Sequence, residues 1–264
     1  VIMLWFGTVT NVGMNGKKEG CGMLPPVLYR HILDERGKEA YRILTDSLLH
    51  LKTEVRLPYS YAESNDVQTL VKAVSLDHPE LFYINWWQYR SQASFFCSHV
   101  TICFDFLIDT ASVKVCWLAI EKEIAKLKHI TSDNGSLWSR YKTIIKHIVS
   151  TVHYNDTGSA FWDHTAAGPI LSSEHTAVCE GIAKLFLLYC QHLYIPCAIV
   201  IGTLDGSPHA WNLIEYNGSV RYIDITSLIG SPVIIGLSLY TKTEEQLLLD
   251  GYQWNASQIR RLVS

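Results

Sequence analysis

The stretch AVCEGIA, residues 177–183, sets a cysteine between a short apolar run and a Glu-Gly pair. The apolar spacing that follows predicts a helix running to about Leu193, with Cys179 in its first turn. Backbone N–H groups and the positive end of the helix dipole stabilise a thiolate at that position and make it a better nucleophile. A cysteine taken alone is more often a small buried residue. The rest of the sequence therefore decides between packing and chemistry.

A predicted β-hairpin follows further along the chain. Residues 210–216 and 219–226 have β-like composition, and they flank Asn217-Gly218. This dipeptide is typical of a two-residue type I′ turn, which fixes the register of the two strands.

The register predicts which side chains share a face of the hairpin. If the turn has two residues, His209 lies opposite Thr226 and Trp211 lies opposite Asp224. His209 and Asp224 are then diagonal neighbours at roughly 7 Å, so a carboxylate can orient the imidazole. A three-residue loop would turn Asp224 away. Together with Cys179, these residues make the Cys-His-Asp arrangement of acyl transfer.

Three segments resemble the core of the transglutaminase-like superfamily of papain-like cysteine enzymes: AVCEGIAKLF, IPCAIVIGT and PHAWNLIEYNGSVRYIDIT. The resemblance covers residues 136–227. It implies an α+β fold, in which the helix of the nucleophile packs on an antiparallel sheet. It also implies that Cys179 is the nucleophile, His209 the general base and acid, and Asp224 the orienting carboxylate.

One more segment, Asp77–Tyr83, is similar to N-terminal extensions of bacterial members of this superfamily. We therefore expect an N-terminal α/β extension over residues 1–110 and a bacterial-type catalytic domain over 111–264. Ile182 and Ser227 differ from the residues that are frequent at those positions in the family, and they leave the substrate open.

Apolar periodicity predicts the other elements. Helices are expected over 27–33 and 39–51, with an interruption between them at Gly37. Further helices are expected from Asn65 onwards and over 112–129 and 136–152. Strands are expected over 81–90 and 93–107, the second with alternate residues buried. Residues 153–175 read as a long loop, which is typical of a functional segment.

Three further side chains are candidates for the substrate or oxyanion site. The backbone N–H of Cys179 is the expected first donor to an oxyanion, and Tyr154 or His164 from the long loop is the expected second donor. Trp211 is expected on the catalytic face, where it would screen the ion pair from water.

Composition excludes several classes of partner. The chain has 264 residues and a net charge of −3, which gives no electrostatic footprint for nucleic acid. The apolar run at residues 1–6 is too short to span a bilayer. Because the chain begins at Val1, we expect a processed form or part of a longer protein. Protein or peptide substrates are the expected partners, and the family resemblance leans towards an extracellular or cell-surface location.

No metal or cofactor is expected. The seven cysteines contain no CxxC pair, which argues against a zinc-ribbon site. Cys97, His99, Cys103 and Asp105 share one face of a predicted strand, but ligands along one extended strand do not converge as tetrahedral zinc requires.

Three functions remain open at this stage. The first is a cysteine acyl transferase of transglutaminase-like type. The second is a peptidase or amidase, in which water takes the acyl group from the same thioester. The third, from a different class, is a non-catalytic protein-binding module, which the presence of all three triad residues disfavours.

Overall fold

The computed structural model describes residues 24, 27–61, 64–93, 99–131, 135–158, 160–230 and 241–263. The helices are α2 (Glu35–Leu49), α3 (Ser64–Asp77), α4 (Thr110–Ile130), α5 (Leu137–Thr151), α6 (Gly168–Leu171), α7 (Cys179–His192), α8 (Glu244–Leu249), α9 (Ala256–Val263) and the 3-10 turns η1 (Tyr29–Ile32), η2 (Tyr59–Tyr61), η3 (Phe161–His164) and η4 (Thr226–Leu228). The strands are β1 (Glu54–Pro58), β2 (Ile84–Ala93), β3 (His99–Phe106), β4 (His153–Tyr154), β5 (Thr176–Ala177), β6 (Cys197–Leu204), β7 (Ser207–Tyr216), β8 (Ser219–Ile223), β9 (Thr241–Lys242) and β10 (Tyr252–Gln253).

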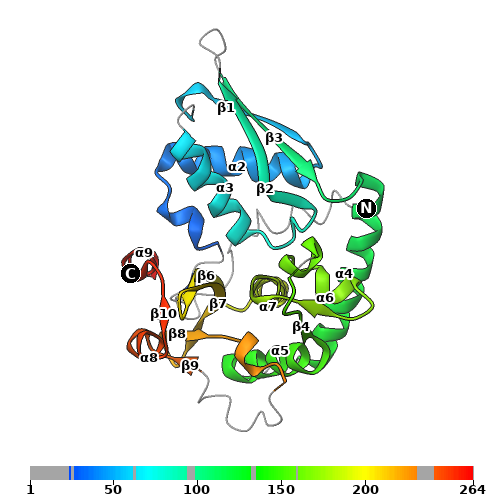
Figure 1. Cartoon of the computed structure of the whole chain (residues 1–264), viewed down its shortest axis with the longest axis vertical. Coiled ribbons are helices and arrows are strands. Elements are labelled where there is room, and N and C mark those ends of the chain that lie inside the picture. Colours follow the sequence, from blue (N-terminus) through cyan, green and yellow to red (C-terminus); the bar gives the residue numbers. More distant parts are fainter. Residues whose placement is uncertain are drawn as a thin grey trace.

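The N-terminal unit is a three-stranded antiparallel sheet, in the order β1-β3-β2, with α2 and α3 packed against it (Figure 1). Val100, Ile102 and Phe104 of β3 are buried in alternation with more exposed neighbours. This confirms a strand with one buried face over residues 99–106 of the expected 93–107, whereas residue 93 belongs to β2 and residues 94–98 lie outside the described residues. Helix α3 confirms the pattern predicted from Asn65, whereas residues 27–33 hold only the short turn η1.

The predicted interruption at Gly37 is wrong, because α2 begins at Glu35 and runs through that glycine. Asp34 caps the helix by accepting the N–H of Gly37 at 2.7 Å. A Cβ atom at Gly37 would lie 2.8 Å from the Cβ of Leu33. Glycine therefore fits this position because a larger side chain would crowd Leu33 at the first turn of the helix.

The C-terminal unit is built on a five-stranded antiparallel sheet, in the order β10-β6-β7-β8-β9. Figure 1 shows α7 between this sheet and α4, α5 and α6. Almost every residue of α7 after its first turn is buried, as expected for a helix that is apolar all round. The α+β fold with the cysteine's helix packed on an antiparallel sheet is thus confirmed.

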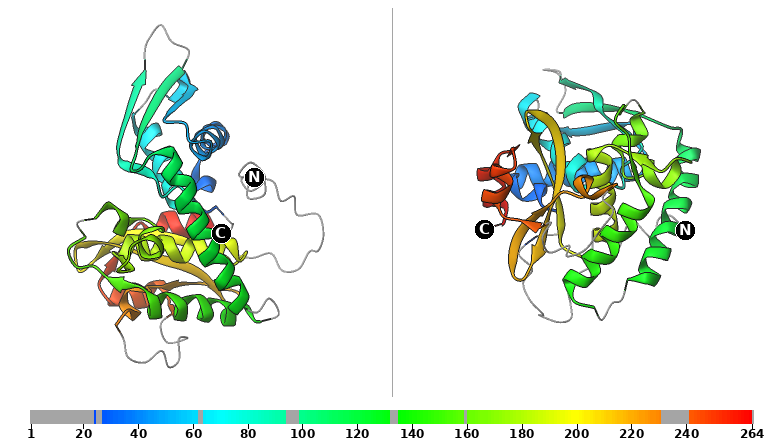
Figure 2. Two further views of the ribbon diagram at one scale, coloured as in Figure 1. Left: turned by 90° about the vertical axis from the view of Figure 1, so that its right-hand side faces the viewer. Right: turned by 60° about the horizontal axis from the view of Figure 1, so that its bottom comes forward.

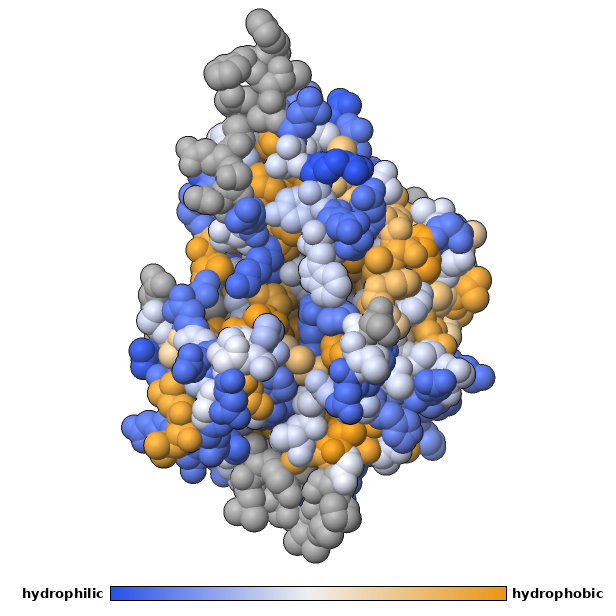
Figure 3. Space-filling model, in the orientation of Figure 1, coloured by the Kyte–Doolittle hydropathy of each residue, from blue (hydrophilic) through white to orange (hydrophobic). Residues whose placement is uncertain are grey.

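Helix α4 leads from the N-terminal unit down the side of the C-terminal unit (Figure 2). Ile120 and Ile124 face inward and are buried, whereas Val115 and Leu118 are each about two-thirds exposed. Figure 3 shows apolar side chains gathered over this helix. None of the helices within the described ranges combines the length and apolarity needed to cross a membrane.

The hairpin β7–β8 has the predicted turn. Asn217 and Gly218 have φ of 51° and 71°, as a type I′ turn requires, and Tyr216 pairs with Ser219. The pairing ends at Asn212 and Ile223, however.

The predicted pairs of His209 with Thr226 and of Trp211 with Asp224 are therefore wrong. Asp224 accepts the N–H of Thr226 on its own carboxylate at 2.9 Å, and the turn η4 begins there. This local side-chain bond competes with the ladder and bends the chain away from β7.

Two long-range hydrogen bonds tie the units together. Tyr29 donates its hydroxyl to the carbonyl of Ile199 on β6 at 2.7 Å, and Gln191 of α7 donates to the carbonyl of Asp77 at 2.8 Å. The expected division at residue 110 stays a prediction.

Candidate active site

Cys179 is the first residue of α7, as the sequence predicted, and its thiol is free. The N-cap is Val178, whose side chain makes no capping hydrogen bond. Its backbone N–H donates to the carbonyl of Asp163 at 3.0 Å. Because the side chain of Val178 accepts no hydrogen bond, the backbone N–H groups of the first turn of α7 can donate to a group that lies in front of the thiol.

The segment before α7 packs around Asp163 and forms hydrogen bonds with it. Only 2% of this residue is exposed, and its carboxylate accepts from Asn155 at 2.6 Å and from Thr176 at 2.9 Å. Its carbonyl lies so close to α7 that a Cβ atom at Gly181 would be 2.1 Å from it. Glycine in the Cys-Glu-Gly sequence therefore permits the loop to pack under the start of the helix.

The predicted long loop over 153–175 is only partly irregular. It contains β4, η3 and α6, and β4 pairs in parallel with β5, placing Tyr154 opposite Ala177. Sequence analysis did not find Asp163. A carboxylate inside a loop gives no periodic signal, and only the loop's length drew attention to this region.

His209 and Asp224 are in direct contact. Nε2 of His209 lies 2.9 Å from Oδ2 of Asp224, and both side chains are at most a tenth exposed. Cys179 also acts on this imidazole, since its interaction with His209 contributes to the raised pKa of the histidine. Because Nε2 faces the carboxylate, Nδ1 is the nitrogen left for the thiol.

The surroundings favour the charged imidazole. Burial lowers the pKa of His209, but hydrogen bonds to Asp224 and Cys179, with their charges, outweigh it and raise the pKa to about 9. His209 is thus an imidazolium at neutral pH, held between a carboxylate and a thiol.

Asp224 is itself held by two further donors. Oδ1 accepts the backbone N–H of Thr226 at 2.9 Å, and Oδ2 accepts the hydroxyl of Tyr252 at 2.7 Å. Tyr252 comes from β10, near the C-terminal end of the described chain. Sequence analysis missed it, since a strand of two residues has no alternation to detect.

Trp211 lies on the catalytic side of the sheet, as expected. Its ring stacks on the imidazole of His209 with centroids 6.0 Å apart, and it is 1% exposed. Trp254 packs edge-on against it at 5.6 Å. This aromatic layer keeps water from one face of the imidazole.

The two loop candidates for oxyanion donation are placed differently. Tyr154 is partly exposed, and burial followed by the charges of Cys179, Asp156 and Asp224 raises its pKa. It therefore lies within electrostatic reach of the thiol. His164 points elsewhere, with Nδ1 at 3.2 Å from Glu180 and Nε2 at 3.3 Å from the carbonyl of Gly158.

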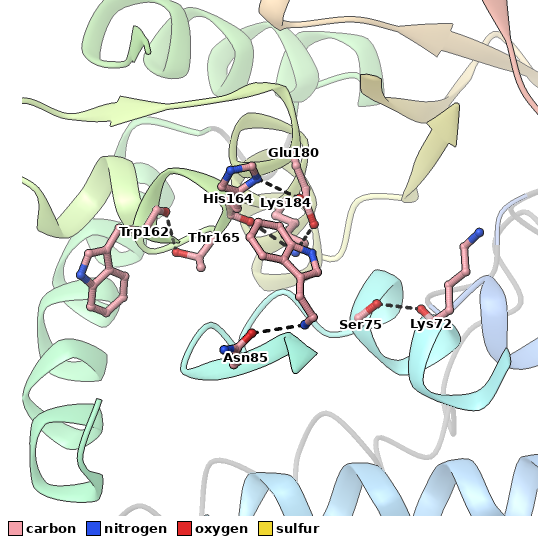
Figure 4. Close-up of polar contacts among 9 residues, drawn as sticks. Lys72, Ser75, Asn85, Trp162, His164, Thr165, Glu180 and Lys184 are labelled. Atoms are coloured by element: carbon pink, nitrogen blue, oxygen red, sulfur yellow. Dashed lines mark hydrogen bonds and ion pairs between the residues drawn. The ribbon is translucent and has the colours of Figure 1, made fainter. Parts of the chain in front are cut away.

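Figure 4 shows Glu180 between His164 and Lys184. The Glu180 carboxylate is 2.6 Å from the Lys184 ammonium, which also donates to the carbonyl of His164 at 3.3 Å. Burial raises the pKa of Glu180, but Lys184 and His164 outweigh it and lower the pKa to about 2. The network fixes η3 to the first turns of α7.

The comparison with protein families finds one matching region. Residues 125–222 match the family model of the transglutaminase-like superfamily. This part of the chain is similar to the core of that superfamily. The match supports a cysteine-enzyme family. Cys179 and His209 lie within the matched region, and Asp224 lies two residues past its end.

Two solved structures are similar to the chain at low identity. One is a TGase, with 12% identity and a TM-score of 0.38, over 75% of this chain and 56% of the other. The second is a provisionally assigned cysteine protease from Cytophaga hutchinsonii, with 15% identity and a TM-score of 0.35, over 54% of this chain and 62% of the other. The chain thus spans less than two thirds of each. The comparison with curated proteins gives no match.

Within the described ranges, no three His, Cys, Asp or Glu side chains are grouped to hold an ion. Of the strand residues considered from the sequence, Cys97 lies outside the described residues.

Proposed function

We propose that this protein is a cysteine-dependent acyl transferase, which acts on protein or peptide substrates through a thioester on Cys179. The observation that carries this proposal is the position of His209. Its imidazole bonds to Asp224 through Nε2, and Cys179, at the start of α7, contributes to its raised pKa. An ion pair in that position supplies both the nucleophile and the acid that acyl transfer needs.

In the first half of the reaction, the thiolate of Cys179 attacks the carbonyl carbon of a carboxamide or peptide. A C–S bond forms and the carbonyl electron pair moves to oxygen. The backbone N–H of Cys179 and the hydroxyl of Tyr154 are the proposed donors to this oxyanion. His209 then gives its proton to the departing nitrogen, the C–N bond breaks, and a thioester remains.

In the second half, a primary amine attacks the thioester carbon and passes its proton to the neutral imidazole. A new C–N bond forms, the C–S bond breaks, and the thiolate–imidazolium pair returns. Water in place of the amine gives hydrolysis by the same route. The burial of His209 and the tryptophan layer beside it favour the amine, because they limit the access of water.

The test uses a glutamine-containing donor peptide with and without a fluorescent primary amine. The parent protein should form the amine adduct, and Cys179→Ala should lower the rate by at least about a thousandfold. Cys116→Ala, which removes another partly exposed free thiol, should retain the parent's rate.

Each other outcome has a definite meaning. Acid product without amine adduct would identify a peptidase or amidase on the same triad. Parental activity in Cys179→Ala would overturn the assignment of the nucleophile. A parent without either product on peptide libraries, together with peptide binding, would favour the non-catalytic module.

A further inference from the structure

We infer that Tyr252 is a positioning residue of the proposed active site and sets the acidity of His209 through Asp224. The inference rests on the proposed function, because it concerns the same ion pair. The hydroxyl of Tyr252 donates to Oδ2 of Asp224 at 2.7 Å, and Nε2 of His209 lies 2.9 Å from that same oxygen. Two donors therefore share one oxygen of the carboxylate.

The fold delivers Tyr252 by adding β10 to the edge of the sheet. Tyr252 pairs with Leu204 of β6, next to the end of the strand that carries Gly202. A Cβ atom at Gly202 would lie 2.1 Å from the carbonyl of Gln253 and 2.7 Å from the ring of Trp211. Glycine at this position lets β10 and the tryptophan approach the sheet together.

The ring of Tyr252 adds a second contact to the same site. It packs edge-on against His209 with centroids 5.9 Å apart and against Trp211 at 5.1 Å. Tyr252 is 4% exposed. The phenol is therefore fixed in place by its neighbours as well as by its hydrogen bond.

The hydroxyl of Tyr252 can act only as a donor to Asp224. Burial raises the pKa of Tyr252 far above its usual range, and the charge of Asp224 raises it further. The phenol is thus neutral at every pH at which an enzyme works, and its single proton points at the carboxylate. Because this donor does not ionise, its hydrogen bond reduces the negative charge on Oδ2 to the same extent at every working pH.

This withdrawal opposes the effect of Asp224 on His209. The carboxylate stabilises the imidazolium, and each additional donor on the carboxylate reduces that stabilisation. An imidazolium that is stabilised too strongly would be a poor acid towards a departing amine. Tyr252 therefore keeps the proton of His209 available for transfer while it holds the carboxylate in place.

Other titratable and charged groups also face this cluster. Cys179 faces His209 from α7, and Tyr154 of β4 feels the charges of both Cys179 and Asp224. Around Tyr252 lie the ammonium of Lys242 from β9, 5.9 Å from the ring centre, and the carboxylates of Asp205 and Asp250.

The experiment is the pH profile of Cys179 alkylation by iodoacetamide, followed by mass spectrometry of the peptide that contains it. In the parent we expect an upper step of the profile near pH 9, where His209 loses its proton. Tyr252→Phe keeps the ring and removes the hydroxyl. Its upper step should rise by about half a pH unit, corresponding to one modest hydrogen bond.

The matched control is Tyr222→Phe. Tyr222 is also a buried tyrosine in contact with Trp254, and its variant should keep the parent's upper step. In an Asp224→Asn background, Tyr252→Phe should cause no further shift, because the carboxylate that links the two residues is gone.

An upper step that Tyr252→Phe leaves in place, or that Tyr222→Phe moves as far, would overturn the inference. Amine transfer is measured separately on the same proteins. If the parent fails to transfer but the upper step still shifts in Tyr252→Phe alone, the coupling through Asp224 stands and the proposed acyl transfer is wrong.

Discussion

The carboxylate of Asp224 forms hydrogen bonds with three groups of the candidate site, which are His209, Tyr252 and the backbone of Thr226. The first residue-scale consequence is electrostatic. The pKa of His209, about 9, depends on that carboxylate. The imidazolium therefore exists below about pH 9 and is lost as the pH rises through that value.

Replacing Asp224 with Asn removes the charge that stabilises this imidazolium. The pKa of His209 should fall, so the upper step of the Cys179 alkylation profile should move to lower pH. Turnover should fall by about a thousandfold or more, since the imidazole loses its orienting partner.

Asp105→Asn is a suitable control for that variant. Asp105 lies at the surface of β3, where it meets Arg90, and its substitution should leave the alkylation profile intact. If Asp224→Asn alkylates Cys179 with the parent's pH profile, then the carboxylate does not act on the imidazole and the triad is wrong.

At the scale of elements, the start of α7 depends on close packing against the loop below it. Gly181→Ala would place a Cβ atom 2.1 Å from the carbonyl of Asp163. Either the helix start or the loop must shift, because the Cβ atom is fixed to the helix backbone and the carbonyl is itself packed backbone. We expect a loss of about 2 kcal/mol of unfolding free energy in urea, within the range for overpacking, together with a changed alkylation rate at Cys179.

Gly206→Ala separates this effect from the general cost of replacing glycine. Gly206 has φ of +81° but open space around its Cβ position. Its variant should lose about 1 kcal/mol through backbone strain alone and alkylate Cys179 as the parent does. Parental stability and alkylation in Gly181→Ala would contradict the proposed packing at the helix start.

The elements that the sequence predicted correctly are those with strong local signals. Helix α7 has a continuous apolar pattern, and the turn at Asn217-Gly218 requires two positive φ angles that these residues tolerate. From that turn, the shared face of His209 and Asp224 followed by parity. The contact itself forms, but the strand pairing from which it was derived ends before these residues.

What the sequence did not predict depends on contacts between distant segments. The end of the β7–β8 ladder depends on a side-chain bond of Asp224 to its own backbone neighbour, which competes with strand pairing. Tyr252 reaches the site through a strand of two residues, and Asp163 acts from within a loop. None of these features produces a periodic pattern in the sequence, so they are found only in the three-dimensional structure.

At the scale of the whole molecule, the N-terminal unit is attached to the core through η1 and α3. Asp77 at the end of α3 accepts the backbone N–H groups of Tyr29 and Arg30 at 3.0 and 2.9 Å and the hydroxyl of Tyr41 at 3.0 Å. Tyr29 in turn donates to β6, and the carbonyl of Asp77 accepts from Gln191 of α7. One buried carboxylate therefore holds the segment that bridges the two units.

Asp77→Asn should weaken this attachment. An amide offers one acceptor oxygen and an NH₂ group, so one of the donors that face Asp77 would meet another donor. The unpaired groups should cost about 2 kcal/mol at pH 7. Because the same residue touches η1 and supports the contact with α7, urea should unfold the variant in a single transition at a lower midpoint.

The pH dependence of that loss gives the sharper check. Burial raises the pKa of Asp77 to about 6, although its hydrogen bonds lower it. A carboxyl group whose pKa is raised on folding holds its proton more tightly in the folded chain, so its contribution is full below about pH 4 and is lost as the pH rises through 6. The variant cannot take up that proton. The difference in unfolding free energy between parent and variant should thus widen as the pH falls from 7 to 5. Asp105→Asn at the surface should stay within about 0.5 kcal/mol of the parent.

Two separate transitions, with only the first moved by Asp77→Asn, would show that the units unfold independently and that Asp77 does not join them.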